Sequence, residues 1–223
     1  MSDTDSFIDE VTEEVRRDQL FALFRKYGWI GILAIVLIVG GASWSEWRKA
    51  QAEAKAQAFG DALVAAMGNN ESAARAKALA DVAAGDQVGG SAGRAAVAAF
   101  LQSAEAEAAG DHAGAVAAIK AVAENADLSP LYRDLAQLKL VTLDGATMDP
   151  AVRDQMLATL AQPGAPYRTL AMEQQAVLLI EAGKTDEAVT LLRAIAEDAD
   201  AAQSQRGRIG QILTALGAGT AES

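Results

Sequence analysis

The longest apolar run of the chain lies near its N-terminus. Residues 27–45 carry no charged side chain and include eight Ile, Leu and Val residues. At about 1.5 Å per residue, a helix of this length covers roughly 28 Å, close to the thickness of the hydrocarbon core of a bilayer. Each of these aliphatic side chains favours insertion by about 0.3 to 0.6 kcal/mol at the bilayer centre. The pattern therefore predicts a transmembrane helix over residues 27–45.

Aromatic and basic residues flank this run on both sides. Tyr and Trp rings suit the headgroup layer because they combine an apolar body with a polar group. Within the run, Gly41 and Ser45 are spaced as a pair of small residues that lets a neighbouring helix approach closely, so they are candidates for helix packing in the membrane. The predicted membrane-interface anchors are Arg25, Lys26, Tyr27, Trp29, Trp44 and Trp47.

The distribution of basic residues favours a cytosolic N-terminus. Residues 1–26 contain four Lys and Arg residues, whereas three follow the span within ten residues, at Arg48, Lys49 and Lys55. A short tail before an apolar segment is typical of a signal anchor, which leaves the larger C-terminal part on the far side. A cleaved signal peptide is the alternative, because residues 40–42 read Gly-Gly-Ala, a sequence that resembles a signal peptidase site.

The cytosolic tail, residues 1–26, has its own apolar pattern. Phe7, Ile8, Val11 and Val15 recur at helical spacing, which predicts a short amphipathic helix near the membrane surface. Such a helix could contact a membrane partner or serve only as an interfacial lead-in.

A membrane-proximal helical hairpin is predicted over residues 46–93. An apolar stripe continues from the span to Met67, and Gly68-Asn69-Asn70 is a stop signal. A second helix follows over about residues 71–84, and residues 85–93 form a loop. This loop contains Gly89-Gly90-Ser91 but lacks both the GK[ST] ending and the preceding strand of a phosphate-binding loop.

The next section, residues 94–216, is internally repetitive. Residues 108–116 recur as residues 181–189, and each copy stands between two helical runs, 97–108 with 113–124 and 167–182 with 186–197. Ser129-Pro130 and Asp149-Pro150 are start signals for two more helices between them. A last helix, about 201–216, is expected to cap the stack with Arg206, Arg208 and Gln211 facing outward, and residues 217–223 are expected to be a disordered C-terminus.

These hairpins resemble tetratricopeptide repeats (TPRs). The pattern consists of a small residue in the first helix, a Gly-containing turn, Ala early in the second helix and a large apolar residue four positions later. Small residues at the helix crossing let two backbones approach to about 8 Å. The resemblance implies an all-α fold, one N-terminal transmembrane helix followed by a TPR-like helical-hairpin solenoid. The predicted repeat-packing residues are Ser103, Gly110, Ala115 and Ile119 in one repeat and Ala176, Gly183, Ala188 and Leu192 in the other.

Composition argues against several kinds of chemistry. The chain has no Cys, which excludes disulfides and thiolate sites, and its net charge of −11 argues against nucleic acid as a partner. His112, the only histidine, falls in a turn, where we expect a solvated residue and no metal or acid-base role. The acidic pairs Glu105 with Glu107 and Glu197 with Asp198 are expected on solvated faces. The sequence therefore predicts no enzyme, no cofactor, no metal and no small-molecule substrate.

The order of parts resembles the YfgM-like family of bacterial inner-membrane proteins. In this chain, a charged tail is followed by basic and aromatic residues at 24–29, by one span whose end lies at 41–48, and then by the TPR-like body. The resemblance implies an ancillary subunit of the Sec translocon, with the N-terminus in the cytosol and the repeats in the periplasm. Its partners would be the lipid bilayer, the translocon channel and a membrane-bound periplasmic chaperone that receives exported proteins. The alternatives are a scaffold in cell-envelope assembly or cell division, or an accessory subunit of another inner-membrane complex.

Overall fold

The computed structural model describes residues 3–219, and side chains from Arg25 onward except those of residues 27, 28, 32 and 87. Its described residues contain α-helices, one short 3₁₀ helix and no strand, which confirms the all-α prediction. The elements are α1 (Asp3–Met67), α2 (Ser72–Ala84), η1 (Asp86–Val88), α3 (Ala92–Ala108), α4 (His112–Ala123), α5 (Pro130–Asp144), α6 (Pro150–Leu160), α7 (Arg168–Glu181), α8 (Thr185–Glu197) and α9 (Gln203–Ala215).

The chain divides into two compact units, residues 1–55 and residues 56–223. Within the first unit, α1 is continuous from Asp3 through the predicted span. The tail is therefore part of one long helix and does not form a separate short helix. The side chains on which the predicted amphipathic face of the tail depends lie outside the described residues.

Helix α1 is long and apolar enough to cross a membrane. Its part from Trp29 to Met67 contains an 18-residue window with a mean hydropathy of 1.6, and none of that window is buried. In a soluble domain, such a face would be covered by other elements, because exposing apolar surface to water is unfavourable. The prediction of one N-terminal apolar helix is confirmed in length and composition.

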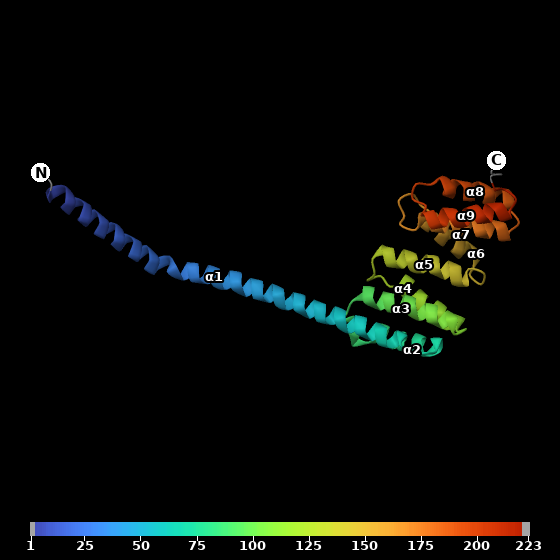
Figure 1. Cartoon of the computed structure of the whole chain (residues 1–223), viewed down its shortest axis with the longest axis horizontal. Coiled ribbons are helices and arrows are strands. Elements are labelled where there is room, and N and C mark those ends of the chain that lie inside the picture. The colour runs from blue at the N-terminus through green and yellow to red at the C-terminus, as the bar shows by residue number, and fades with distance from the viewer. Residues whose placement is uncertain (1–2, 220–223) are drawn as a thin grey trace. The chain divides into compact units, whose positions relative to one another are not determined.

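The second unit consists of helices that follow one another through short turns (Figure 1). Side-chain caps and prolines begin several of them. The Asp149 carboxylate accepts hydrogen bonds from the backbone N–H groups of Ala151 and Val152, and Pro150 occupies the first turn of α6. Pro130 likewise occupies the first turn of α5, although the Ser129 side chain makes no cap hydrogen bond. The expected loop after α2 instead contains η1, which ends at Val88 and is followed by Gly89 with a φ of 58°. Only glycine adopts this left-handed conformation at little cost.

Among the described residues, four hydrophobic clusters form the core, and each joins consecutive helices. The first links the end of α1 to α2 and α3, the second α3 to α4 and α5, the third α5 to α6 and α7, and the fourth α7 to α8 and α9. Helices α3, α5 and α7 thus contribute to two clusters each. This arrangement is typical of a solenoid, in which every repeat contacts only its neighbours.

Candidate interaction surface

The structure buries the side chains predicted to pack the repeats. Ser103, Ala115 and Ile119 are fully buried where α3 and α4 meet. Ala176 and Leu192 belong to the cluster that joins α7, α8 and α9. A larger side chain at Ser103, Ala115 or Ala176 would separate the helices.

The remaining predicted packing residues are one buried alanine and the two glycines of the turns. Ala188 is also fully buried, early in α8. Gly110 and Gly183 occupy the two corresponding turns with φ values of 78° and 75°. A residue with a Cβ is rarely stable at these angles, so the two glycines let each helical hairpin close tightly.

Ser103 has a feature that its burial alone does not explain. Its hydroxyl oxygen is buried and has no hydrogen-bond partner among the described residues. An unpaired buried hydroxyl is unfavourable by about 1 to 3 kcal/mol. The corresponding residue in the later repeat is Ala176, which avoids this cost.

Two open grooves lie at corresponding places in two of the hairpins. One, of about 260 Å³, lies between α2, α3 and α4, and the other, of about 390 Å³, lies between α6, α7 and α8. Gln102 and Ala118 line the first groove, and Gln175 and Leu191, both 73 residues later, line the second. The spacing equals that of the repeated turn sequences, so the two grooves are equivalent places in two repeats. The first is lined mainly by Ala, whereas the second has several Leu side chains.

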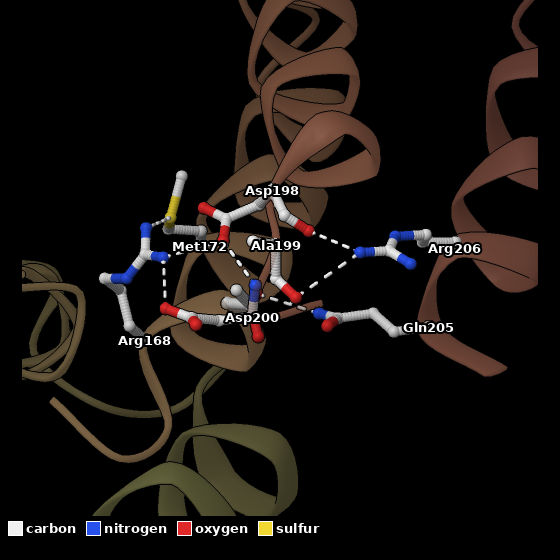
Figure 2. A network of polar contacts seen from close by, with 8 residues as sticks. Arg168, Met172, Asp198, Ala199, Asp200, Gln205 and Arg206 are labelled. Carbon is white, nitrogen blue, oxygen red and sulfur yellow. Dashed lines mark hydrogen bonds and ion pairs between the residues drawn. The ribbon is translucent and has the colours of Figure 1, made fainter. Parts of the chain in front are cut away.

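A network of charged groups joins the end of α8 to α7 and α9 (Figure 2). The Arg168 guanidinium lies 2.8 Å from an Asp198 carboxylate oxygen and 2.9 Å from one of Asp200. Arg206 of α9 donates a 2.6 Å hydrogen bond to the backbone carbonyl oxygen of Asp198. The pKa of the Asp198 carboxyl is lowered, first by a hydrogen bond from the backbone N–H of Asp200 and then by Arg168.

A second polar contact links α7 directly to α9. The buried Glu173 carboxylate accepts hydrogen bonds from Nε and Nη2 of Arg208, each at 2.8 Å, and from the Gln205 amide at 2.9 Å. The same amide nitrogen of Gln205 lies 2.9 Å from the Thr169 carbonyl oxygen. The pKa of Arg208 is raised by its hydrogen bonds to Glu173. This forked geometry holds α9 in a fixed register against α7.

A comparison with protein-family models identifies the architecture. The model described as "Tetratricopeptide repeat-like domain" matches residues 24–188, which is more than half of the chain. The chain belongs to the tetratricopeptide repeat-like family. The match begins before the apolar run and ends early in α8, so α9 lies outside it. Neither a search of curated proteins nor a search of solved structures returns a significant match.

TPR-like domains are protein-interaction modules, typically without catalytic activity of their own. Among the described residues, no group of three or more His, Cys, Asp or Glu side chains could hold a metal ion. His112 is half exposed at the start of α4, and its Nδ1 lies 2.7 Å from a Glu107 carboxylate oxygen. Its Nε2 lies 3.8 Å from a carboxylate oxygen of Asp144. The histidine therefore connects the ends of α3 and α5 at the surface of the TPR-like body.

Two expectations about solvated acidic residues are wrong. The Glu105 carboxylate is largely covered and lies 2.7 Å from the Arg75 guanidinium. Asp198 is covered to a similar extent by its contact with Arg168. In both pairs the basic partner is 30 residues away in sequence, so local spacing gave no sign of it.

The outer face of α9 also differs from expectation. Arg206, Arg208 and Gln211 are exposed as predicted, but both arginines are engaged in the contacts with Asp198 and Glu173. Sequence reasoning missed Glu173 and Gln205, which are buried polar residues of the TPR-like body. The separation of 35 residues in sequence between Glu173 and Arg208, close to one repeat, could have indicated that the two are neighbours.

The predicted membrane anchors lie along α1. Arg25, Lys26, Trp29, Trp44 and Trp47 are exposed, and the Trp44 and Trp47 rings lie 5.2 Å apart. The side chain of Tyr27 lies outside the described part. Gly41 and Ser45 are exposed on the same helix, and a Cβ at Gly41 would meet no atom within 4 Å. Their roles in the membrane stay predictions.

The last described residues return toward α8. The backbone N–H of Ala218 donates to the carbonyl oxygen of Leu213 at 2.8 Å, and Arg193 donates to the carbonyl oxygen of Ala218 at 3.1 Å. Residues 220–223, which complete the predicted disordered C-terminus, lie outside the described residues.

Proposed function

We propose that this protein is a non-enzymatic, membrane-tethered TPR-like interaction module that acts as an ancillary subunit of the bacterial Sec translocon. In this proposal the N-terminal tail lies in the cytosol, α1 crosses the inner membrane, and the repeats lie in the periplasm. The body contacts the channel and hands exported proteins to a membrane-bound periplasmic chaperone. One observation carries the proposal, namely that an uncovered apolar helix and a TPR-like body occur in the same chain.

The first helices of the hairpins offer a surface for such contacts. Val64 of α1 and Val97 of α3 are 33 residues apart, close to one TPR period, and both remain exposed, at 75% and 36%. An exported chain that has not yet folded exposes apolar side chains, which would bury against such a row. Val152 of α6 is exposed at 55% but belongs to a second helix of a hairpin, so it serves as a matched control.

Site-specific crosslinking in intact membranes tests this function. A photoreactive amino acid at Val97 should capture the translocon channel, the chaperone and exported proteins, whereas the same probe at Val152 should capture them poorly. Capture of division or envelope-assembly proteins at Val97 in place of the channel would favour a scaffold in those processes. Equal capture at both positions would contradict the assignment of the surface.

Protease treatment of spheroplasts tests the orientation separately. A protease added outside should cleave the TPR-like body and leave the N-terminal tail attached to the membrane. If the body is cleaved only after permeabilisation, the proposed topology is wrong, and the periplasmic function is wrong with it.

A further inference from the structure

Helix α9, the last of the stack, has an equivalent helix one repeat earlier, namely α7. The α5 and α7 core residues Ala136 and Ala171 are fully buried and 35 residues apart, and Glu173 of α7 pairs with Arg208 of α9 at the same separation. Helix α9 therefore follows α7 by one repeat. It is equivalent to the first helix of a hairpin.

This register identifies which side of α9 a second helix would cover. On α7, Met172, Ala176 and Ile180 pack in the cluster shared with α8 and α9. The residues 35 positions later on α9 are Gly207, Gln211 and Ala215. All three line an open groove of about 1150 Å³ that is bounded by α8, by α9 and by Ala218 and Gly219, which follow α9. The groove thus lies where the second helix of a hairpin packs in the preceding repeat.

The composition of this side of α9 fits a close approach by another helix. Glycine inside a helix lowers its stability relative to alanine. Nevertheless, α9 has Gly207 and Gly210 on the groove side, and a Cβ at either position would meet no described atom within 4 Å. No packing constraint within the described chain therefore requires glycine there. A helix that approaches this side from another molecule would supply one.

We propose that the groove is filled by helix α9 of a second copy of this chain, so that the two copies form a symmetric dimer. The two helices of a hairpin run antiparallel, and a two-fold axis perpendicular to α9 produces an antiparallel pair of the same helix. Each α9 then serves as the missing second helix of the other copy. The contact extends the packing already seen between α7 and α8.

The charges around the groove agree with self-association. Arg193 and Glu197 lie one turn apart on α8, and both line the groove. One guanidinium nitrogen of Arg193 donates to the Ala218 carbonyl oxygen of its own chain, and the charge of this side chain and that of Glu197 give each copy one cation and one anion to face its symmetry mate. The complete chain carries a net charge of −11, which opposes contact between two copies, so this local pairing of opposite charges has to offset that repulsion. If α1 holds both copies in one bilayer, the high effective concentration allows even a small interface to form.

Disulfide crosslinking of the full-length chain in its native membrane tests the dimer. The chain has no cysteine, so a single one can be introduced without background. Gln211→Cys places a thiol in the groove near the two-fold axis, and Ala158→Cys, at an exposed position of α6, is the matched control. After oxidation, Gln211→Cys should form about tenfold more covalent dimer than Ala158→Cys, because only the former holds the two thiols together.

A second substitution separates docking from folding. Gly210→Leu, introduced together with Gln211→Cys, should fill the groove and lower the dimer yield about tenfold, while the thermal midpoint stays the same or rises because leucine favours helix. Dimer formation equal to that of the Ala158→Cys control would overturn the proposal. So would a dimer yield that Gly210→Leu leaves unchanged, or a disulfide from Gln211→Cys to a different protein. Resistance of the chain to carbonate extraction is measured in parallel, so failure of membrane anchoring is recognised independently.

Discussion

The contact between Glu173 and Arg208 should contribute measurably to the stability of the body. Glu173 is 7% exposed, and its carboxylate accepts three hydrogen bonds of 2.8 to 2.9 Å, two of them from one guanidinium group. A hydrogen bond to a charged group contributes about 1.5 to 3 kcal/mol, whereas an exposed ion pair contributes about 0 to 1 kcal/mol. The Arg208 side chain is 50% exposed, so the lower part of the first range applies.

We therefore expect Glu173→Gln to lower the free energy of unfolding by about 1.5 to 2 kcal/mol. For a domain of this size, each kcal/mol corresponds to about 2 to 4 °C, so the thermal midpoint should fall by about 3 to 8 °C. The measurement is the loss of the helical circular dichroism signal of the full-length chain in detergent micelles. Glu124→Gln is the matched control, because Glu124 pairs with Lys120 in an exposed contact and should lose less than about 0.5 kcal/mol.

A double-mutant cycle separates the contact from the individual effects. Arg208→Gln alone leaves the buried carboxylate with the Gln205 amide as its remaining donor, so its cost should be similar to that of Glu173→Gln. The double variant should be more stable than the sum of the single effects predicts, with a coupling energy of about 1 to 2 kcal/mol. Additive effects, or a loss in Glu173→Gln no larger than in Glu124→Gln, would refute the argument that this contact fixes α9.

Four further substitutions test other parts of the body. Ala188→Glu should cost about 2 to 4 kcal/mol, because the fully buried methyl group leaves no space for a charged side chain; an unchanged melting temperature would contradict the repeat alignment. Gly145→Ala should lower the free energy of unfolding by about 1 to 3 kcal/mol, because the added Cβ would overlap a carbonyl oxygen of the preceding turn. Gly207→Ala should instead raise it by up to about 1 kcal/mol, because alanine favours helix and its Cβ meets no atom within 4 Å. Denaturant titration of both variants measures the two changes. Because the pKa of Asp198 is lowered in the folded state, its stabilising effect is present above about pH 4 and is lost as the pH falls through the folded value. Asp198→Asn should therefore reduce the fall in melting temperature between pH 5 and pH 3, and an unchanged fall would argue against this contribution.

Local rules were sufficient to predict the helices of the body. Pro130 and Pro150 begin α5 and α6 as expected, because proline fits the first turn of a helix and lacks the N–H that would be unpaired there. Gly110 and Gly183 adopt the left-handed conformation that ends the first helix of each hairpin. These signals lie within a few residues of the structure they determine, so they can be read from one sequence.

The polar contacts between helices could not be predicted by the same rules. Helical spacing correctly places Arg208 on the surface, but it does not show that a buried carboxylate 35 residues earlier lies within reach. Glu105 and Asp198 were expected to be solvated for the same reason, since their arginine partners are 30 residues away. Pairing across a stack depends on how the hairpins are rotated against one another, and apolar periodicity constrains this rotation only weakly.

The division of the core into clusters of consecutive helices has a consequence for how the body opens. Helix α9 contributes to one cluster, whereas α3, α5 and α7 each bridge two. Because α9 is also the last helix of the stack, fraying of a single copy should start at the C-terminal end, and amide hydrogen exchange should be fastest in α9 and slowest in α5. A molecule bound at that end would slow exchange in α9 first, and its effect should weaken with each cluster toward α2.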